Sequence, residues 1–124
     1  MSPNEALIRD FLAAFDAIDL DRIMGFFAAD AVYHNIPVQP VQGTAAIRAV
    51  LTGFMGMASE VKWVTHHLAE TRDGVVLTER TDRFLVRGKW IELPVMGSFT
   101  LRDGRIAAWR DYFDMKQFQD QLAP

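Results

Sequence analysis

The sequence of 124 residues contains no cysteine, no run of basic residues and no long apolar stretch. Without cysteine the chain cannot carry a disulfide scaffold, a thiolate nucleophile or a cysteine-ligated metal site. Its formal net charge is −3, which makes nucleic acid an unexpected partner. No apolar run approaches the roughly 18 residues of a membrane-spanning helix, and no basic region leads into an apolar one at the N-terminus. We therefore predict a soluble cytoplasmic protein that binds neither nucleic acid nor membranes.

The composition is that of an ordinary globular protein, with 50% hydrophobic and 23% charged residues. A chain of this length can bury roughly two thirds of its unfolded surface, so its core needs no metal or disulfide. The sequence also has no internal repeat and no low-complexity linker. We expect residues 1–124 to form a single domain.

The first half of the chain has a helical pattern. Ser2, Pro3 and Glu5 form a capping-box sequence, which predicts a helix that starts at Pro3. Apolar residues then recur at helical spacing. The predicted elements are helices from Pro3 to about Ala17, from the Asp19 cap to near Asp30 and from Gly43-Thr44 to about Gly56, with a short strand at 31–37.

From Glu60 the pattern changes to alternation, with many β-branched and aromatic residues. It predicts strands at 61–69, 74–86, 90–101 and 105–113 and a short closing helix through Met115, Phe118 and Leu122. Arg87-Gly88 and Asp103-Gly104 are hairpin turn signals. The predicted class is α+β, with a strongly curved, mostly antiparallel sheet and three N-terminal helices packed on one face. Such a sheet can enclose a pocket between itself and the helices.

Several polar residues lie on strand faces that are otherwise apolar. Arg80 and Asp82 share a face whose ends are apolar, and Asp111 lies between two aromatic residues on its own strand face. Tyr33 and Asn35 share a face of the short strand at the same spacing of two. Buried charge is unfavourable unless it is paired, so these positions are candidates for a site.

The hairpin signals predict that the three charged residues face the same way. A two-residue turn at Arg87-Gly88 places Arg80 opposite Val95, and a three-residue loop at 102–104 places Asp111 opposite Val95 as well. Two strand spacings separate Arg80 from Asp111, about 10 Å, which the side chains can close over the valine. A change of one residue in either turn would move Asp111 to the other face.

Two carboxylates joined by one guanidinium can perform acid–base chemistry. Two nearby like charges cannot both ionise freely, so one carboxyl can stay protonated as an acid while the other acts as a base. The Tyr33 hydroxyl and the Asn35 amide could hold a water against the base. This set suits the addition of water to a strained, uncharged electrophile. A purely structural ion network is the alternative interpretation.

Three segments carry a resemblance to a known family, namely 33–35 (Tyr-His-Asn), 78–82 (Thr-Glu-Arg-Thr-Asp) and 109–114 (Trp-Arg-Asp-Tyr-Phe-Asp). They resemble the limonene-1,2-epoxide hydrolase family, a branch of the nuclear-transport-factor-like and polyketide-cyclase-like cone fold. The resemblance covers essentially the whole chain and includes Gly97 and Asp103-Gly104. It implies a cone-shaped fold with a central pocket, no cofactor and a homodimer.

The resemblance also implies a role for each polar residue. Asp111, with Tyr33 and Asn35, would position and deprotonate the attacking water. Asp82 would protonate the epoxide oxygen, and Arg80 would bridge the two carboxylates.

His66 and His67 are adjacent on a strand and cannot both face a metal ion, so no metal is expected.

The predicted register also places apolar residues around the polar set. Leu93 and Val95 lie between the two polar strands, Phe84 and Phe113 flank them, and Phe54 is a contact from the third helix. An apolar wall with few polar groups suits a small hydrophobic epoxide rather than a charged metabolite. These five residues are the predicted substrate-binding positions.

The predicted function is therefore that of a cofactor-independent epoxide hydrolase that adds water to give a vicinal diol. One alternative is a polyketide-cyclase-like or ketosteroid-isomerase-like enzyme of the same fold, which would need only one acid–base residue. Another is a non-catalytic module that binds a small apolar ligand. Dependence of turnover on both Asp82 and Asp111 distinguishes the hydrolase from these alternatives.

Overall fold

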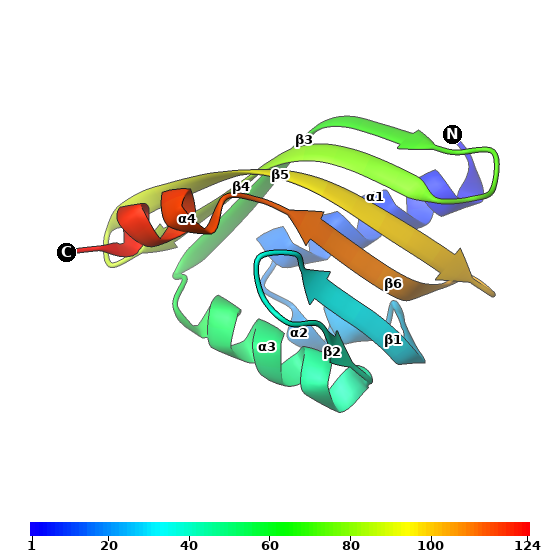
Figure 1. The fold of residues 1–124 in the computed structure, drawn as a ribbon, viewed down its shortest axis with the longest axis horizontal. Coiled ribbons are helices and arrows are strands. Elements are labelled where there is room, and N and C mark those ends of the chain that lie inside the picture. The colour runs from blue at the N-terminus through cyan, green and yellow to red at the C-terminus, as the bar shows by residue number, and fades with distance from the viewer.

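The computed structural model describes residues 1–124 as four helices and six strands (Figure 1). The helices are α1 (Pro3–Asp16), α2 (Leu20–Met24), α3 (Thr44–Gly56) and α4 (Met115–Leu122). The strands are β1 (Phe27–Asn35), β2 (Val41–Gln42), β3 (Glu60–Glu70), β4 (Val76–Val86), β5 (Lys89–Arg102) and β6 (Arg105–Tyr112). None of the helices is both long and apolar enough to cross a membrane.

The strands form one curved sheet with the order β2-β1-β6-β5-β4-β3. Neighbouring strands are antiparallel except β1 and β6, which are parallel, so the sheet is mixed. Figure 1 shows the sheet curving over α1 and α3. The α+β class predicted from the sequence is confirmed, and the first and last helices occur where the sequence places them. Ser2 caps α1 through the predicted capping box with Glu5.

The second helix and the first strand differ from the prediction. The helix ends at Met24 instead of near Asp30, and β1 starts at Phe27 instead of Ala31. Gly25 follows the helix and ends it, and Phe27 pairs with Ile106 of β6. Apolar residues at 26 and 27 continue the helical pattern in the sequence, which hides the change of element. The prediction also missed β2, whose two residues are too few to form a pattern.

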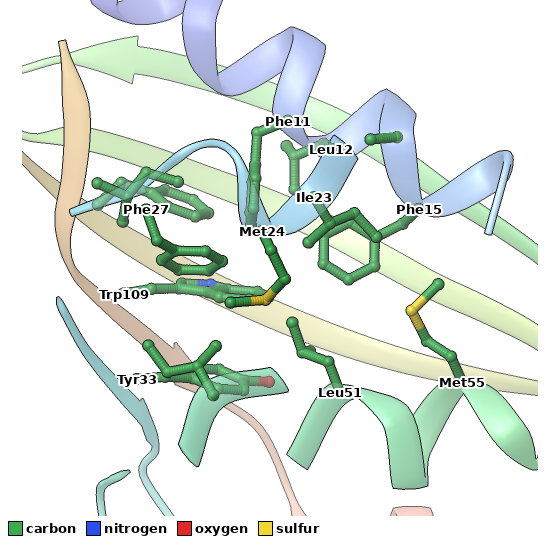
Figure 2. Packing of buried hydrophobic residues seen from close by; sticks show 14 of the residues in the cluster. Phe11, Leu12, Phe15, Ile23, Met24, Phe27, Tyr33, Leu51, Met55 and Trp109 are labelled. Atoms are coloured by element: carbon green, nitrogen blue, oxygen red, sulfur yellow. The ribbon is translucent and has the colours of Figure 1, made fainter. Parts of the chain in front are cut away.

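The core lies between α1, the sheet and α3, and Trp109 is its centre (Figure 2). The Trp109 ring is fully buried and packs edge-on against Phe11 of α1, with ring centroids 5.1 Å apart. On its other side it stacks on Tyr33 at 4.2 Å. Phe15 of α1 stacks on Trp63 of β3 at 4.0 Å. These contacts fix the inner faces of β1, β3 and β6 relative to one another.

The register between β4 and β5 is the predicted one. Val86 pairs with Lys89, and Arg80 therefore lies opposite Val95. The burial of β4 alternates along its length, so Arg80 and Asp82 face inward as expected. Pro94 lies within this pairing without a shift in register.

The register between β5 and β6 differs from the prediction. Asp103 and Gly104 form a two-residue turn in which both have positive φ, 53° and 72°, so Arg102 pairs with Arg105. A bulge then shifts the pairing, because Leu101 pairs with Ile106 and Thr100 with Ala108. Asp111 consequently lies opposite Gly97 and not opposite Val95.

Candidate active site

The Arg80 guanidinium lies between Asp82 and Asp111 and uses all five of its N–H groups. Nε and Nη2 donate to the two oxygens of Asp82, both at 2.9 Å. Nη2 and Nη1 donate to the two oxygens of Asp111, at 2.8 and 3.2 Å. The remaining N–H of Nη1 donates to the Thr78 hydroxyl at 3.1 Å. One arginine thus binds both carboxylates in bidentate fashion, a geometry that a lysine cannot reproduce.

Gly97 makes this arrangement sterically possible. One row across β4, β5 and β6 consists of Thr78, Gly97 and Asp111. The guanidinium passes over Gly97 to contact Asp111. A Cβ atom at Gly97 would lie 2.4 Å from Arg80 Nη1 and 2.8 Å from Asp111 Oδ1. In the sequence Gly97 stands out only as part of the family resemblance, because the bulge that aligns it with Asp111 has no clear sequence signal.

Trp109 contacts the second carboxylate directly. Trp109 and Asp111 are two residues apart on β6 and point to the same side of the sheet. The indole Nε1 donates to Asp111 Oδ1 at 2.7 Å, and the ring stacks on Tyr33. Trp109 is one of the two aromatic residues that flank Asp111 in the sequence pattern, but spacing does not predict the hydrogen bond from its indole.

The three charged side chains are almost completely buried. Arg80, Asp82 and Asp111 are 1%, 5% and 3% exposed. Burial acts to lower the pKa of Arg80, but the charges of Asp111 and Asp82 outweigh it and raise that pKa above its ordinary value. Burial raises the pKa of Asp82 to about 6, and the Arg80 charge opposes that rise. Arg80 therefore stays charged, whereas Asp82 can carry a proton near neutral pH.

Tyr33 and Asn35 reach the same place from β1. The parallel pairing with β6 sets Tyr33 beside Trp109 and Asn35 beside Asp111. Burial, followed by the Asp111 charge, raises the pKa of Tyr33 well above its ordinary value. The phenol therefore remains protonated and can donate a hydrogen bond. His34 faces the other way and contacts the Val38 carbonyl, as expected from the alternation.

A cavity of about 130 Å³ opens over the polar residues. Its lining consists of Tyr33, Asn35, Val38, Val50, Leu51, Phe54, Trp63, Asp82, Phe84, Leu93, Val95, Asp111, Phe113, Met115 and Phe118. All five predicted wall residues are in this set, together with four of the five predicted polar residues. Arg80 is the exception, because it lies behind the carboxylates, away from the cavity.

Part of the cavity wall lies outside the predicted set. Trp63 pairs with Asp82 across β3 and β4, and Val61 and Trp63 on one strand face could have indicated its inward orientation. Leu51 lies on the buried side of α3. Met115 and Phe118 come from α4, whose position over the cavity depends on tertiary packing that no local pattern encodes.

The cavity thus combines an apolar wall with one polar end. The polar end holds one carboxyl that can be protonated, a second that accepts three hydrogen bonds, a neutral phenol and an amide. No group of three or more His, Cys, Asp or Glu side chains is arranged to hold a metal ion. These groups can donate a proton to one atom of a small ligand and remove one from a water beside it.

The sequence and the fold both match known proteins. The profile of the limonene-1,2-epoxide hydrolase catalytic domain matches residues 2–123. Epoxide hydrolase EphG of Mycobacterium tuberculosis is 32% identical over 111 residues, which cover 87% of this chain and 71% of that protein.

Two solved structures illustrate the likeness of the fold. An M. tuberculosis LEH-like epoxide hydrolase is 28% identical with a TM-score of 0.83, covering 97% of this chain and 89% of that one. An NTF2-like protein of unknown function from Burkholderia pseudomallei covers both chains completely with a TM-score of 0.88 at 18% identity. At that identity the likeness concerns the fold alone.

Proposed function

Because the chain belongs to the limonene-1,2-epoxide hydrolase family, we propose that it adds water to a small apolar epoxide and releases a vicinal diol. The observation that carries this proposal is the pair of carboxyl groups, Asp82 and Asp111, joined by Arg80 at the polar end of an apolar cavity. The reaction needs an acid, a base and a water, and the chain's own side chains supply the first two without a cofactor.

The reaction proceeds in one step. Asp111 removes a proton from a water held by Tyr33 and Asn35 while the water oxygen attacks an epoxide carbon. The bond between that carbon and the epoxide oxygen breaks, and Asp82 delivers its proton to this oxygen. Asp111 then releases the proton that it gained and Asp82 takes one up, which restores the starting state. Arg80 keeps the two carboxyl groups in place throughout.

The cavity wall selects the substrate. Leu93, Val95, Phe84, Phe113 and Phe54 offer no hydrogen bonds, so they favour a hydrocarbon body. The cavity of about 130 Å³ is smaller than the roughly 300–1,000 Å³ of pockets for drug-sized ligands, which favours a small epoxide.

The proposal extends to the assembly. We regard residues 1–124 as one epoxide hydrolase-like domain that forms a homodimer. Leu77, Met96 and Tyr112 are 43%, 53% and 51% exposed on the outer face of the sheet, and Met96 lies opposite Tyr112. An exposed apolar group of this kind supports an interface between two copies. Light scattering of the purified protein tests the dimer.

The test of function is diol formation from limonene oxide, cyclohexene oxide and styrene oxide with a metal chelator present. We expect chelator-resistant turnover that falls at least about a hundredfold in Asp82→Asn and in Asp111→Asn, as for loss of a positioned acid or base. Circular dichroism and thermal unfolding confirm that the variants fold. Near-normal rates in either folded variant would refute the assigned roles.

Other outcomes point to the alternative functions. Turnover that survives the loss of one aspartate, on a carbonyl substrate, would indicate cyclase-like or isomerase-like chemistry. Binding of apolar ligands without turnover on any epoxide, unchanged in Asp111→Asn, would indicate a binding module.

A further inference from the structure

We propose that Trp109 is a positioning residue that determines which of the two carboxyl groups holds the proton. The inference rests on the proposed function, because it explains why Asp82 serves as the acid and Asp111 as the base. Arg80 donates two hydrogen bonds to each carboxylate, whereas Trp109 donates one to Asp111 and none to Asp82.

The hydrogen bonds of Arg80 stabilise the two carboxylates to a similar extent. Asp82 accepts two N–H groups from the guanidinium, and Asp111 also accepts two. The two carboxyl side chains are similarly buried, at 7% and 5% exposure. With one positive and two negative groups enclosed together, a single proton would neutralise the cluster, and Arg80 alone gives that proton no strong preference.

The Trp109 indole makes the two carboxylates unequal, because it donates a hydrogen bond to Asp111 only. Its Nε1 donates to Asp111 Oδ1 at 2.7 Å, the shortest of the hydrogen bonds to either carboxylate. A donor stabilises an ionised carboxylate more than a neutral carboxyl group, so the third donor favours a charged Asp111. The proton is thereby directed to Asp82. Trp109 is completely buried and stacked on Tyr33 and Phe99, so the indole cannot rotate away.

Few other groups act on the pair. Tyr33 of β1 stays neutral, and the charge of Asp16 at the end of α1 raises the pKa of Asp82. The inner side chains of the remaining elements carry no charge, namely Trp63 of β3, Thr78 of β4, Leu93, Val95 and Gly97 of β5, Leu51 and Phe54 of α3 and Phe118 of α4. Apart from Arg80, the Trp109 indole is the side chain that donates a hydrogen bond to one of the two carboxylates and not to the other.

The first test uses Trp109→Phe, which keeps an aromatic ring and removes the N–H. We expect kcat/KM on the best epoxide of the panel to fall roughly 10- to 100-fold, the effect of losing a hydrogen bond to a charged group. The acid limb of the pH–rate profile should also move to higher pH, because Asp111 binds a proton more readily without the indole. Trp90→Phe is the matched control, since Trp90 lies on β5 outside the cavity and its indole makes no hydrogen bond.

The second test locates the proton without any substrate. Aspartate labelled with ¹³C at the side-chain carboxyl reports ionisation by NMR between pH 4 and 8, with Asp82→Asn and Asp111→Asn to assign the two signals. In the native protein the first proton taken up should appear on Asp82. In Trp109→Phe it should be divided between Asp82 and Asp111. If Trp109→Phe does not fold, benzothienylalanine at position 109 keeps the ring shape and lacks the N–H.

Each outcome is decisive for the inference. A first proton that stays entirely on Asp82 in the variant would overturn it, and so would a native protein that protonates Asp111 first. The NMR titration needs no turnover, so a chain that forms no diol but redistributes its proton as expected would refute the proposed function and leave the role of Trp109 standing. A pH–rate profile that Trp109→Phe lowers without shifting would indicate a structural role only.

Discussion

Two arginines on β4 form ion pairs of nearly equal length on opposite faces of the sheet. Arg80 meets Asp82 at 2.9 Å on the inner face, where the side chains are 0% and 7% exposed. Arg83 meets Glu92 at 2.8 Å on the outer face, where they are 27% and 59% exposed. The distances are alike, but water can replace the outer partner and cannot replace the inner one. The surroundings of an ion pair, and not its length, therefore determine what its loss does.

The inner pair should give the largest effect when it is broken. Arg80→Met leaves two buried carboxylates without a counter-charge, and such a loss typically destabilises a protein by about 3–5 kcal/mol. Urea unfolding of the variant against the native protein measures this difference at pH 8. The matched control is the same substitution at Arg83. A variant of Arg80 as stable as the control would show that the inner cluster is not a buried ionic unit.

Filling the space above Gly97 with a methyl group should give the next largest effect. In Gly97→Ala the new Cβ displaces the guanidinium and the Asp111 carboxylate, and a misplacement of about 1 Å can lower a rate about a hundredfold. Stability should fall by about 1–3 kcal/mol through overpacking. Gly53→Ala on α3 is the control, because no atom lies within 4 Å of its added Cβ. Equal activities of the two alanine variants would contradict this role of Gly97.

The effect of pH should be smaller at pH 7, about tenfold, and should come from the inner face alone. In the proposed mechanism Asp82 must be protonated in the free enzyme, and its pKa is raised to about 6. On the alkaline side, kcat/KM should therefore fall about tenfold per unit above about pH 6. A profile that stays flat from pH 5 to 9 would argue against Asp82 as the acid.

The same raised pKa also affects folding. The folded protein binds the Asp82 proton more tightly than the unfolded chain does. The contribution of this group to stability consequently decreases as the pH rises from about 4 to about 6.

The outer pair should give the smallest effect. Arg83→Met removes the contact with Glu92 and the stacking on Trp90, and exposed pairs contribute about 0–1 kcal/mol. Urea unfolding at low and high salt should show a small loss that salt reduces further. A loss above about 3 kcal/mol would remove the distinction between the two faces.

The inward orientation of the site could be predicted, because alternation along β4 is a local property. Arg80 and Asp82 lie on the same face as Val76 and Phe84, and the burial pattern of the strand follows this alternation. The turn at Arg87-Gly88 also has a clear signal, so the pairing of Arg80 with Val95 was predicted correctly.

The pairing of β6 shows where sequence reasoning stops. The prediction used a three-residue loop and no bulge, whereas the chain has a two-residue turn and a bulge near Ala107. Each difference alone would turn Asp111 to the other face, and together they restore its orientation while moving it by two residues, from Val95 to Gly97. Nothing local marks the bulge. The residues that follow it pair with β1 and include Trp109 of the core, and neither contact can be predicted from a local pattern.

The engagement of all five N–H groups of Arg80 affects which ligands the cavity admits. A buried arginine in a pocket commonly acts as a receptor for carboxylates or phosphates. Here every N–H is already engaged within the protein, and the two aspartates lie between the guanidinium and the cavity. An anionic metabolite would meet negative oxygen atoms and find no free cation. Because both aspartates shield Arg80 from the cavity, the site should exclude acids although it contains a cation.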